Sequence, residues 1–388
     1  MAIDQTLTGL VETIYRAMHT VSREQTGALL AVNLDARAAG AALNQTVRAP
    51  IAPAATLEDF TPAVTVPNTG AATQSYADVT LTKSRVAPIP ISGEEELSLG
   101  GHASVLMEQR IAQGIRALNN EMESFICEMA VKGASRAYGT AATTPFASSL
   151  ADAAQILRIL DDNGAPGKGD SNYRSLIINS AAGVNLRSLA NLMTANSNGT
   201  DQTLRNGLLL PIVGLGIRES AGIYSHTAGA GTGYDVNNGS GEAIGQTTLT
   251  LDGGTVNSTG IKAGDVVTFA GDTNKYVVKT GLTATTGDIV IGNPGLRTLV
   301  ADTTEMTIGA TYTGNFGFSR NAISFATRAP ARPSVGDGAA MIETVIDPLT
   351  GIAYTFSLYK LFGAVRFQVE IVYGGAVVQG EHIATLLG

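Results

Sequence analysis

The sequence predicts an α+β fold in which an all-β module interrupts a larger body. Three patterns predict this fold. A helical pattern of apolar residues runs from 104 to 132, short β-runs rich in glycine and threonine occupy residues 226–315, and alternating apolar residues near the C-terminus indicate an antiparallel meander. The 388 residues, 44% of them hydrophobic, suffice for two or three domains with a sizeable core.

The charge balance restricts the classes of function. The chain carries 25 basic residues against 33 acidic ones, for a net charge of −8, and has no basic run. Affinity for nucleic acid depends largely on Lys and Arg neutralising phosphates, so we expect no strong binding to DNA or to an anionic membrane. This charge is compatible with a protein that encloses DNA without binding it.

Cysteine content and hydropathy indicate a reducing cytoplasm and no membrane association. The single cysteine, Cys127, excludes an intrachain disulfide and a cysteine-rich zinc site, and its helical position predicts core packing. The first residues lack the basic start and long apolar core of a secretory signal. The longest apolar run, residues 207–217, falls short of the ~20 residues that span a bilayer.

The glycine-rich stretch LRILDDNGAPGKGDSNYRSLIINS, residues 157–180, raises the question of a phosphate-binding loop. Such a loop needs G-x-x-x-x-G-K-[ST] leading from a strand into a helix, so that backbone N–H groups face the phosphate. Here Gly169 follows Lys168, and a helix precedes a buried strand at residues 175–179. We therefore interpret the stretch as a helix-to-strand turn.

The helix before this turn has start and stop signals. Ser149 and Asp152 resemble a capping box, and Asn163 followed by Gly164 suits a helix C-terminus. After the buried strand, one apolar face predicts a second helix over residues 182–193.

No catalytic, cofactor-binding or metal-binding constellation is found. The segment AGAGTGYD, residues 228–235, lacks the G-x-G-x-x-G order, and no G-x-S-x-G motif occurs. We expect a protein that is not an enzyme, with no cofactor and no metal. The histidines lack any metal-ligand spacing; they are His19, His102, His226 and His382.

Two segments are expected to need a surface to lie on, either in the same chain or on a neighbour. Residues 7–21 form an amphipathic helix with Leu7, Leu10 and Ile14 on its apolar side, ahead of a loose alanine-rich linker. Residues 44–92 contain six of the 13 prolines and frame a long, projecting two-stranded hairpin. A lone two-stranded hairpin is marginal in water.

An acidic run, Glu94, Glu95 and Glu96, follows the hairpin. One interpretation is a solvated acidic turn. The alternative is that these carboxylates meet Arg or Lys side chains of a neighbouring subunit.

Phrases along the whole chain resemble the major capsid proteins of tailed bacteriophages, which have the HK97-type fold, and most of all the P22-like coat proteins with their inserted β-barrel domain. The phrases are LTGLVETIYRAMHTVSRE (7–24), QTVRAPIAPAAT (45–56), FTPAVTVPNTG (60–70), LTKSRVAPIPISGEEELSL (81–99), DDNGAP (161–166) with RSLIINSAAGVNLRSL (174–189), GFSRNAISFATRAPARP (317–333) and DPLTGIAYTFSLYKLFGAVRFQVEIVYG (347–374).

The resemblance implies a virion capsid protein that forms an icosahedral shell of hexamers and pentamers. It implies assembly in the bacterial cytoplasm with scaffolding and portal proteins, through a procapsid that expands as double-stranded DNA is packaged. The shell encloses this DNA without sequence-specific binding, and no membrane is involved. The hypothesised intersubunit contacts are Leu7, Leu10, Ile14, Lys83, Arg85, Glu94, Glu95 and Glu96.

The resemblance also implies a division of the chain. The expected segments are an N-terminal arm (1–43), an extended loop (44–100), the spine helix of the peripheral domain (101–148), the first part of the axial domain (149–225), the inserted β-barrel domain (226–315), a return through the axial domain (316–340) and the C-terminal strands of the peripheral and axial domains (341–388). Two alternatives remain open: the shell of an encapsulin-like compartment, and a β-rich phage tail or adhesin protein.

Overall fold

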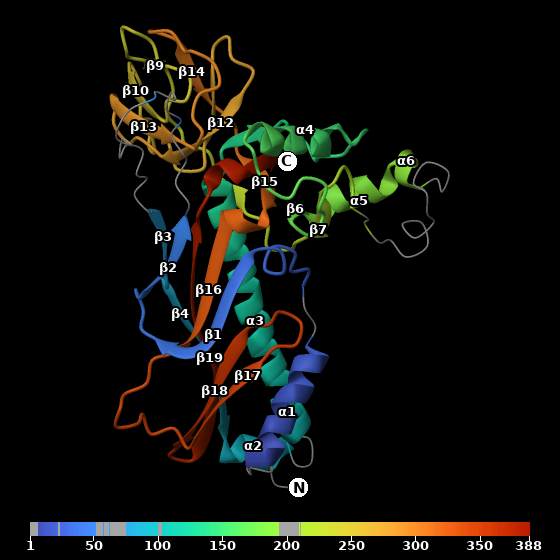
Figure 1. Ribbon diagram of the computed structural model, residues 1–388. Helices are drawn as coiled ribbons and strands as arrows, with labels where there is room; N and C mark the ends of the chain where they lie inside the picture. The colour runs from blue at the N-terminus through green and yellow to red at the C-terminus, as the bar shows by residue number, and fades with distance from the viewer. Residues whose placement is uncertain are drawn as a thin grey trace.

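The computed structural model describes residues 7–21, 24–51, 57, 62, 75–99, 103–193, 209 and 211–388. The molecule is elongated, with a β-rich lobe at one end and helices α1 and α2 at the other (Figure 1). The helices are α1 (Leu7–Thr20), α2 (Gly93–Leu99), α3 (Ala103–Lys132), α4 (Ala151–Asp162), α5 (Ser180–Ser188) and α6 (Ala190–Met193).

A six-stranded sheet forms one side of the body. Its strands are β1 (Asn33–Ala41), β4 (Lys83–Ser92), β16 (Ile323–Pro330), β17 (Met341–Ile346), β18 (Ala353–Leu361) and β19 (Ala364–Val377). The strands β17, β18 and β19 form an antiparallel meander, which confirms the pattern predicted from the sequence. The long strand β19 pairs with β18 and β16 along successive parts of its length, and also with β4.

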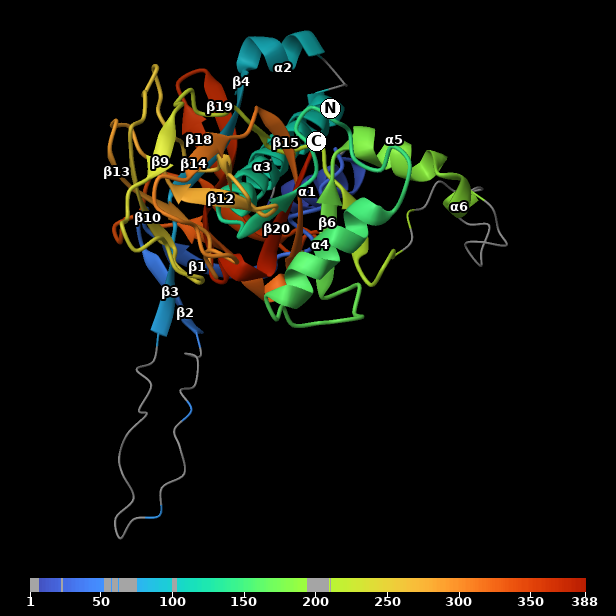
Figure 2. The ribbon, with the colours of Figure 1, turned by 90° about the horizontal axis from the view of Figure 1, so that it is seen from above.

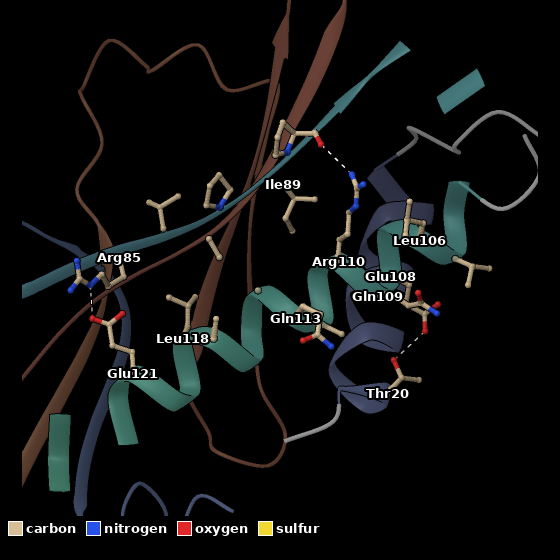
Figure 3. Close-up of a pocket in the computed structure, with 18 of the residues that line it drawn as sticks. Thr20, Arg85, Ile89, Leu106, Glu108, Gln109, Arg110, Gln113, Leu118 and Glu121 are labelled. Atoms are coloured by element: carbon tan, nitrogen blue, oxygen red, sulfur yellow. Dashed lines mark hydrogen bonds and ion pairs between the residues drawn. The ribbon is translucent and has the colours of Figure 1, made fainter. Parts of the chain in front are cut away.

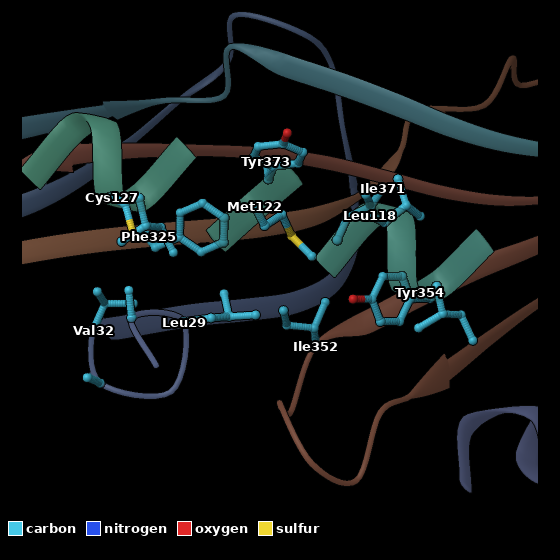
Figure 4. Packing of buried hydrophobic residues seen from close by; sticks show 14 of the residues in the cluster. Leu29, Val32, Leu118, Met122, Cys127, Phe325, Ile352, Tyr354, Ile371 and Tyr373 are labelled. Atoms are coloured by element: carbon cyan, nitrogen blue, oxygen red, sulfur yellow. The ribbon is translucent and has the colours of Figure 1, made fainter. Parts of the chain in front are cut away.

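Helix α3 packs against this sheet and confirms the helix predicted over residues 104–132. Its buried face meets aromatic side chains of the sheet, among them Phe325 and Tyr373 (Figure 4). Cys127 lies within this packing, fully buried, and burial raises the pKa of its thiol well above the ordinary value. The core contacts of the helix are Met107, Ile111, Ile115, Leu118, Met122 and Ile126.

The N-terminal segment docks on its own chain. Helix α1 contacts α3, and Ile14, Ala17 and Met18 are buried at this contact. The expectation of a loose linker after α1 is wrong, because residues 33–41 form β1, which pairs in parallel with β16. Small side chains gave this segment no strand-like alternation, and its pairing partner lies far along the chain.

The predicted hairpin does not extend to residues 83–92. Strands β2 (Thr46–Ile51) and β3 (Ser75–Thr80) form a separate two-stranded sheet that leaves one side of the body, while α2 stands on the opposite side (Figure 2). Most of the predicted tip lies outside the described residues. Residues 83–92, which were predicted to belong to the hairpin, are instead β4 of the main sheet. Among the described strands β4 pairs with β19 alone, so Pro88 and Pro90 are tolerated there.

A second sheet carries the smaller α/β part. Its body strands run in the order β5 (Arg136–Tyr138), β20 (Ile383–Leu387), β15 (Tyr312–Ser319), β6 (Arg174–Ile178) and β7 (Gly216–Glu219), and β8 (Ser225–His226) pairs with β15. Helix α4 contacts β5, β15 and β20. The expected single helix over 182–193 is wrong at Leu189, whose extended backbone separates α5 from α6.

The glycine-rich stretch is a helix-to-strand turn, as predicted. Gly164 has φ +72°, its N–H donates to Asp161 O, and the Ala165 N–H donates to Leu160 O, which together form a Schellman C-terminus. The predicted capping box at the other end of α4 is wrong. The Asp152 carboxylate there accepts the N–H of Phe146 at 2.7 Å.

Residues 226–311 build the lobe at the far end of the molecule. Its strands are β9 (Tyr234–Val236), β10 (Thr248–Asp252), β11 (Val266–Phe269), β12 (Lys275–Thr280), β13 (Gly287–Ile291) and β14 (Glu305–Ile308). Their pairings run β11–β14–β9–β10–β13–β12 and return from β12 to β11, so the strands form a closed ring around their own hydrophobic core. Strand β12 also pairs with β5, which joins the lobe to the body.

Candidate functional site

A groove of about 1290 Å³ lies between strand β4 and helix α3 (Figure 3). Its floor is apolar and includes Ala87, Ile89 and Leu118. Gly114 brings α3 close to the strand, because a Cβ there would lie 3.2 Å from the Cβ of Ala87. The arrangement presents an open apolar surface with a charged rim.

Ion pairs within the chain occupy the rim of this groove. Arg85 Nε donates to Glu121 Oε1 at 2.6 Å, and this hydrogen bond and the nearby charge raise the pKa of the guanidinium. Arg110 pairs with Glu95 and also donates to the carbonyl of Pro90 at 3.3 Å. Because both pairs are substantially exposed, they contribute little to stability and serve mainly to shape the rim.

The acidic run is a helix and not the turn that one interpretation of the sequence gave it. Glu95 is the third residue after Ser92, and its N–H donates to the Ser92 hydroxyl at 3.2 Å. This contact begins α2, whose first turn holds all three carboxylates, where the helix dipole favours negative charge. The S-x-x-E spacing was the available signal for this helix, and it was missed.

The structure brings only some of the predicted contact residues together. Arg85 and Glu95 line the same groove, each with a partner on α3. Lys83 begins β4 opposite Tyr373, at the far end of the strand from α2. Ile14 is 1% exposed and covered by its own chain, and the side chains of Leu7 and Leu10 lie outside the described residues.

Buried polar groups anchor the N-terminal segment. The Glu123 carboxylate, on a residue 1% exposed, accepts the N–H groups of Ala28 and Leu29 at 2.7 and 2.8 Å. As a charged residue, Glu123 is not part of the apolar pattern that predicts the helix. Glu123 lies four residues from both Asn119 and Cys127, so the three residues share one face of α3, and all three are buried. This spacing was the only signal for the buried position of Glu123.

A second anchor joins β1 to β16. Arg328 donates to the carbonyl and the carboxylate of Asp35, each at 2.7 Å. Partial burial by itself raises the pKa of Asp35, but the hydrogen bonds and charges of Arg328 and Arg37 outweigh it, so the pKa is below its ordinary value.

Exposed apolar side chains gather at the end of the molecule that carries α2. The N–H of Gly93 donates to the carbonyl of Gly363 at 3.1 Å, which places the start of α2 beside the β18–β19 turn. Phe362 in that turn is 107% exposed and Leu97 on α2 is 84% exposed. Apolar groups concentrated in this way are typical of an interaction surface.

Among the described residues, no group of three or more His, Cys, Asp or Glu side chains could hold a metal ion. The helices in the described ranges include none that is both long enough and apolar enough to cross a membrane.

Comparison with known proteins gives matches in structure only. No family model matches the sequence, and no curated protein matches it. A chain in the capsid structure of the cyanophage P-SCSP1u matches with a TM-score of 0.50 and 11% identity, covering 95% of this chain and 89% of that one. A Mycobacterium phage Che8 chain matches with a TM-score of 0.45 and 14% identity, covering 88% and 84%. A virus-like particle from Pyrococcus furiosus matches with a TM-score of 0.43 and 10% identity, covering 98% and 99%.

The cyanophage match extends over nearly the whole of both chains and is therefore not limited to one shared motif. At 11% identity the likeness is one of fold. This chain therefore has the mixed α/β fold of a phage capsid protein, in agreement with its sequence resemblance to the coat proteins of tailed phages.

Proposed function

We propose that this protein is the major capsid protein of a tailed bacteriophage and self-assembles into the icosahedral shell that encloses its double-stranded DNA. The observation that carries the proposal is the fold shared with the cyanophage capsid chain over 95% of this sequence. We assign the chain to the HK97-type fold and to its P22-like branch. In this assignment the closed ring of β9–β14 is the inserted barrel domain, and α3 is the spine helix.

The exposed features of the isolated chain support an assembling subunit. The strands β2 and β3 pair with no third strand in the described part of the structure, and Tyr76 on β3 is largely exposed. The base of the hairpin packs on its own chain, because Val79 of β3 is 1% exposed in a cluster with Ala326 and Val372, whereas Tyr76 is left exposed. Phe362 and Leu97 leave further apolar area in water at another end of the molecule. Neighbouring subunits would cover both regions.

Assembly can use contacts that are individually weak. Burial of apolar surface stabilises by roughly 25 cal/mol per Å². Each subunit in a closed shell has several neighbours, so modest interfaces add to a large effective avidity. The acidic net charge of −8 suits a container that must not adhere to the phosphates of its cargo.

By their position in the fold, the proposed intersubunit residues form two groups. Lys83, Arg85 and Glu94 to Glu96 belong to the accessible strand and helix beside the groove. Leu7, Leu10 and Ile14 belong to α1, where Ile14 holds the helix on α3 and thereby presents the remaining α1 surface to a neighbour. Scaffolding protein and portal protein complete the proposed pathway, in which a procapsid expands on DNA packaging.

Electron microscopy of the protein expressed with and without its scaffolding protein tests the proposal. We expect closed shells of uniform size in the presence of the scaffold, with a lattice of hexamers and pentamers. A monodisperse monomer in both samples, without shells or tubes, would overturn the assembly function. Fibres or small rings would assign the chain to a tail structure, and shells that contain an enzyme cargo would assign it to a cellular compartment.

A further inference from the structure

A second cavity, of about 210 Å³, lies where the β-rich lobe meets the body. Strand β5 forms one wall with Arg136 to Tyr138, helix α4 forms another, and residues 273–275 at the start of β12 close it. Figure 1 shows α4 beside this end of the lobe. The cavity is therefore formed jointly by the lobe and the body.

Arg136 is buried in the wall of this cavity with incomplete pairing. The residue is 3% exposed, and its buried Nε has no hydrogen-bond partner among the described residues. Its Nη atoms reach Asn274 at 3.4 Å, Asp162 at 3.4 Å and Asn163 at 3.2 Å. These distances lie at or beyond the long end of the range for N–H···O bonds. A buried guanidinium is costly unless its donors are satisfied.

Further cationic groups surround Arg136. Arg158 on α4 lines the cavity and is exposed. It forms no ion pair with another described residue. Lys275 also lines it, with its amine directed to the carbonyl of Gly139. Burial lowers the pKa of Arg136, and the positive charge of Arg297 lowers it further, so a fourth cation is near.

The acidic groups nearby do not balance these cations. Asp162 is the carboxylate closest to the guanidinium, at 3.4 Å, and its side chain is 38% exposed. Asp272 is held by the hydroxyls of Tyr276 and Thr298 and by the amide of Asn274. An otherwise acidic protein thus has a concave site in which positive charge predominates.

We propose that this cavity binds a small tetrahedral oxyanion of the phosphate or sulfate class. The guanidinium groups of Arg136 and Arg158, which both line the cavity, would be its principal donors, because planar guanidinium groups match the oxygen spacing of such anions. Gln155 and Asn274 on the walls offer amide donors. At ~30 Å³ for each water, the volume equals about seven waters, which accommodates the anion and some of its hydration.

The bound anion would join the lobe to the body. Arg136 belongs to β5, Arg158 to α4 and Asn274 to the segment that leads into β12, so one anion bridges three elements. A ligand that binds only the folded state stabilises it in proportion to the logarithm of its free concentration. Phosphate should therefore raise the unfolding temperature beyond the effect of ionic strength.

Thermal unfolding and 31P NMR line broadening of the full chain test the proposal with sodium phosphate against sodium chloride at equal ionic strength. We expect a phosphate-specific stabilisation and a broadened phosphate signal. Arg158→Gln should weaken the apparent affinity about tenfold or more, since a charged hydrogen bond is lost. Arg320→Gln, at an exposed arginine outside the cavity, is the matched control and should leave the affinity unchanged.

Either of two results would overturn the proposal. One is a response to phosphate no larger than that to chloride in the unmodified chain. The other is a phosphate effect that Arg158→Gln leaves intact, because the ion would then bind elsewhere. Arg136→Gln should also abolish the effect, but Arg158→Gln decides the matter if the buried substitution prevents folding. If a short oligonucleotide binds as tightly as phosphate and its binding also requires Arg158, the site would be assigned to a phosphodiester in place of a free anion.

Discussion

The carboxylate of Glu123 on α3 accepts a hydrogen bond from the backbone N–H of Ala28 at 2.7 Å, across 95 residues of sequence. The same carboxylate accepts the N–H of Leu29. These two donors belong to a segment without regular helix or strand hydrogen bonds, which leads from α1 to β1. Glu123 therefore supplies the acceptors that let this segment be buried at the centre of the body.

Replacing Glu123 by Gln should lower the free energy of unfolding by about 2–4 kcal/mol, because a buried N–H donor would then face an amide NH2 group. Chemical denaturation followed by circular dichroism measures the change. Glu128→Gln is the matched control on the same helix. Glu128 forms an exposed ion pair with Lys132 at i+4, and loss of this pair should lower the free energy of unfolding by no more than about 0.5 kcal/mol. Equal losses in the two variants would contradict the anchoring role.

The Asp35–Arg328 pair predicts an acid-sensitive attachment of β1. The pKa of Asp35 is lowered in the folded state, so its contribution is fully present above the unfolded value of about 3.9 and is lost as pH falls through the folded value. We expect Asp35→Asn to destabilise the protein at pH 7. The difference from the unmodified chain should shrink as the pH falls below about 4.

Urea unfolding at a series of pH values from neutral to acidic tests this expectation. Asp78→Asn is the control, since Asp78 forms an exposed pair with Arg48 on the hairpin. A difference between Asp35→Asn and the unmodified chain that stays constant from neutral to acidic pH would contradict the pairing with Arg328.

Elements with a strong local pattern could be predicted from the sequence. Helix α3 repeats apolar residues at steps of three and four over its whole length, and β18 and β19 alternate large apolar residues that face one core. In these segments the burial pattern follows directly from the period. The turn after α4 was also predicted, because Asn163 and Gly164 give a local stop signal.

Elements that depend on distant partners could not be predicted. Strand β1 is rich in alanine and is held by Arg328, which lies 293 residues away from Asp35. Residues 83–92 belong to the main sheet and not to the predicted hairpin because they pair with β19, and nothing in their own sequence indicates that partner. For the candidate site, the sequence identified Arg85 and Glu95, but only the fold brings their α3 partners to them.

Alanine substitutions at two glycines of the helix-to-strand turn should lower the free energy of unfolding by different amounts. Gly164 and Gly167 have φ values of +72° and +82°, so an L-residue is strained at both. A Cβ at Gly164 meets nothing within 4 Å, whereas one at Gly167 would lie 2.3 Å from the ring of Tyr173. Gly164→Ala should cost roughly 1–2 kcal/mol in free energy of unfolding from backbone strain alone. Gly167→Ala should cost more.

Thermal and chemical unfolding of the two alanine variants distinguish a structural turn from a ligand loop. Both variants should leave any binding of nucleotide or phosphate unchanged. A similar cost for the two substitutions would show that Tyr173 does not pack as described. Loss of nucleotide binding in Gly167→Ala without loss of stability would restore the phosphate-loop interpretation.

The exposed apolar end supplies a test of assembly that does not depend on folding. Phe362 and Leu97 contribute almost nothing to the core of the isolated chain, because both are largely or fully exposed. Surface substitutions of this kind usually change the free energy of unfolding by no more than about 0.5 kcal/mol. The double substitution Phe362→Ser with Leu97→Ser should therefore leave a folded subunit whose unfolding temperature is close to that of the unmodified chain.

Loss of these side chains should nevertheless reduce shell formation. Fully burying one such side chain is worth roughly 1.5–3 kcal/mol, and the loss recurs at every subunit of the shell. We expect the variant to remain as unassembled subunits at concentrations where the unmodified chain forms closed particles, as measured by sedimentation velocity and electron microscopy. Val184→Ser is the matched control: Val184 is also exposed but belongs to α5, which Figure 1 shows far along the molecule from α2, and this variant should form more shells than the double variant. Normal shells from the double variant would show that this end stays in solvent after assembly, and the proposed intersubunit contacts of α2 would then have to be abandoned.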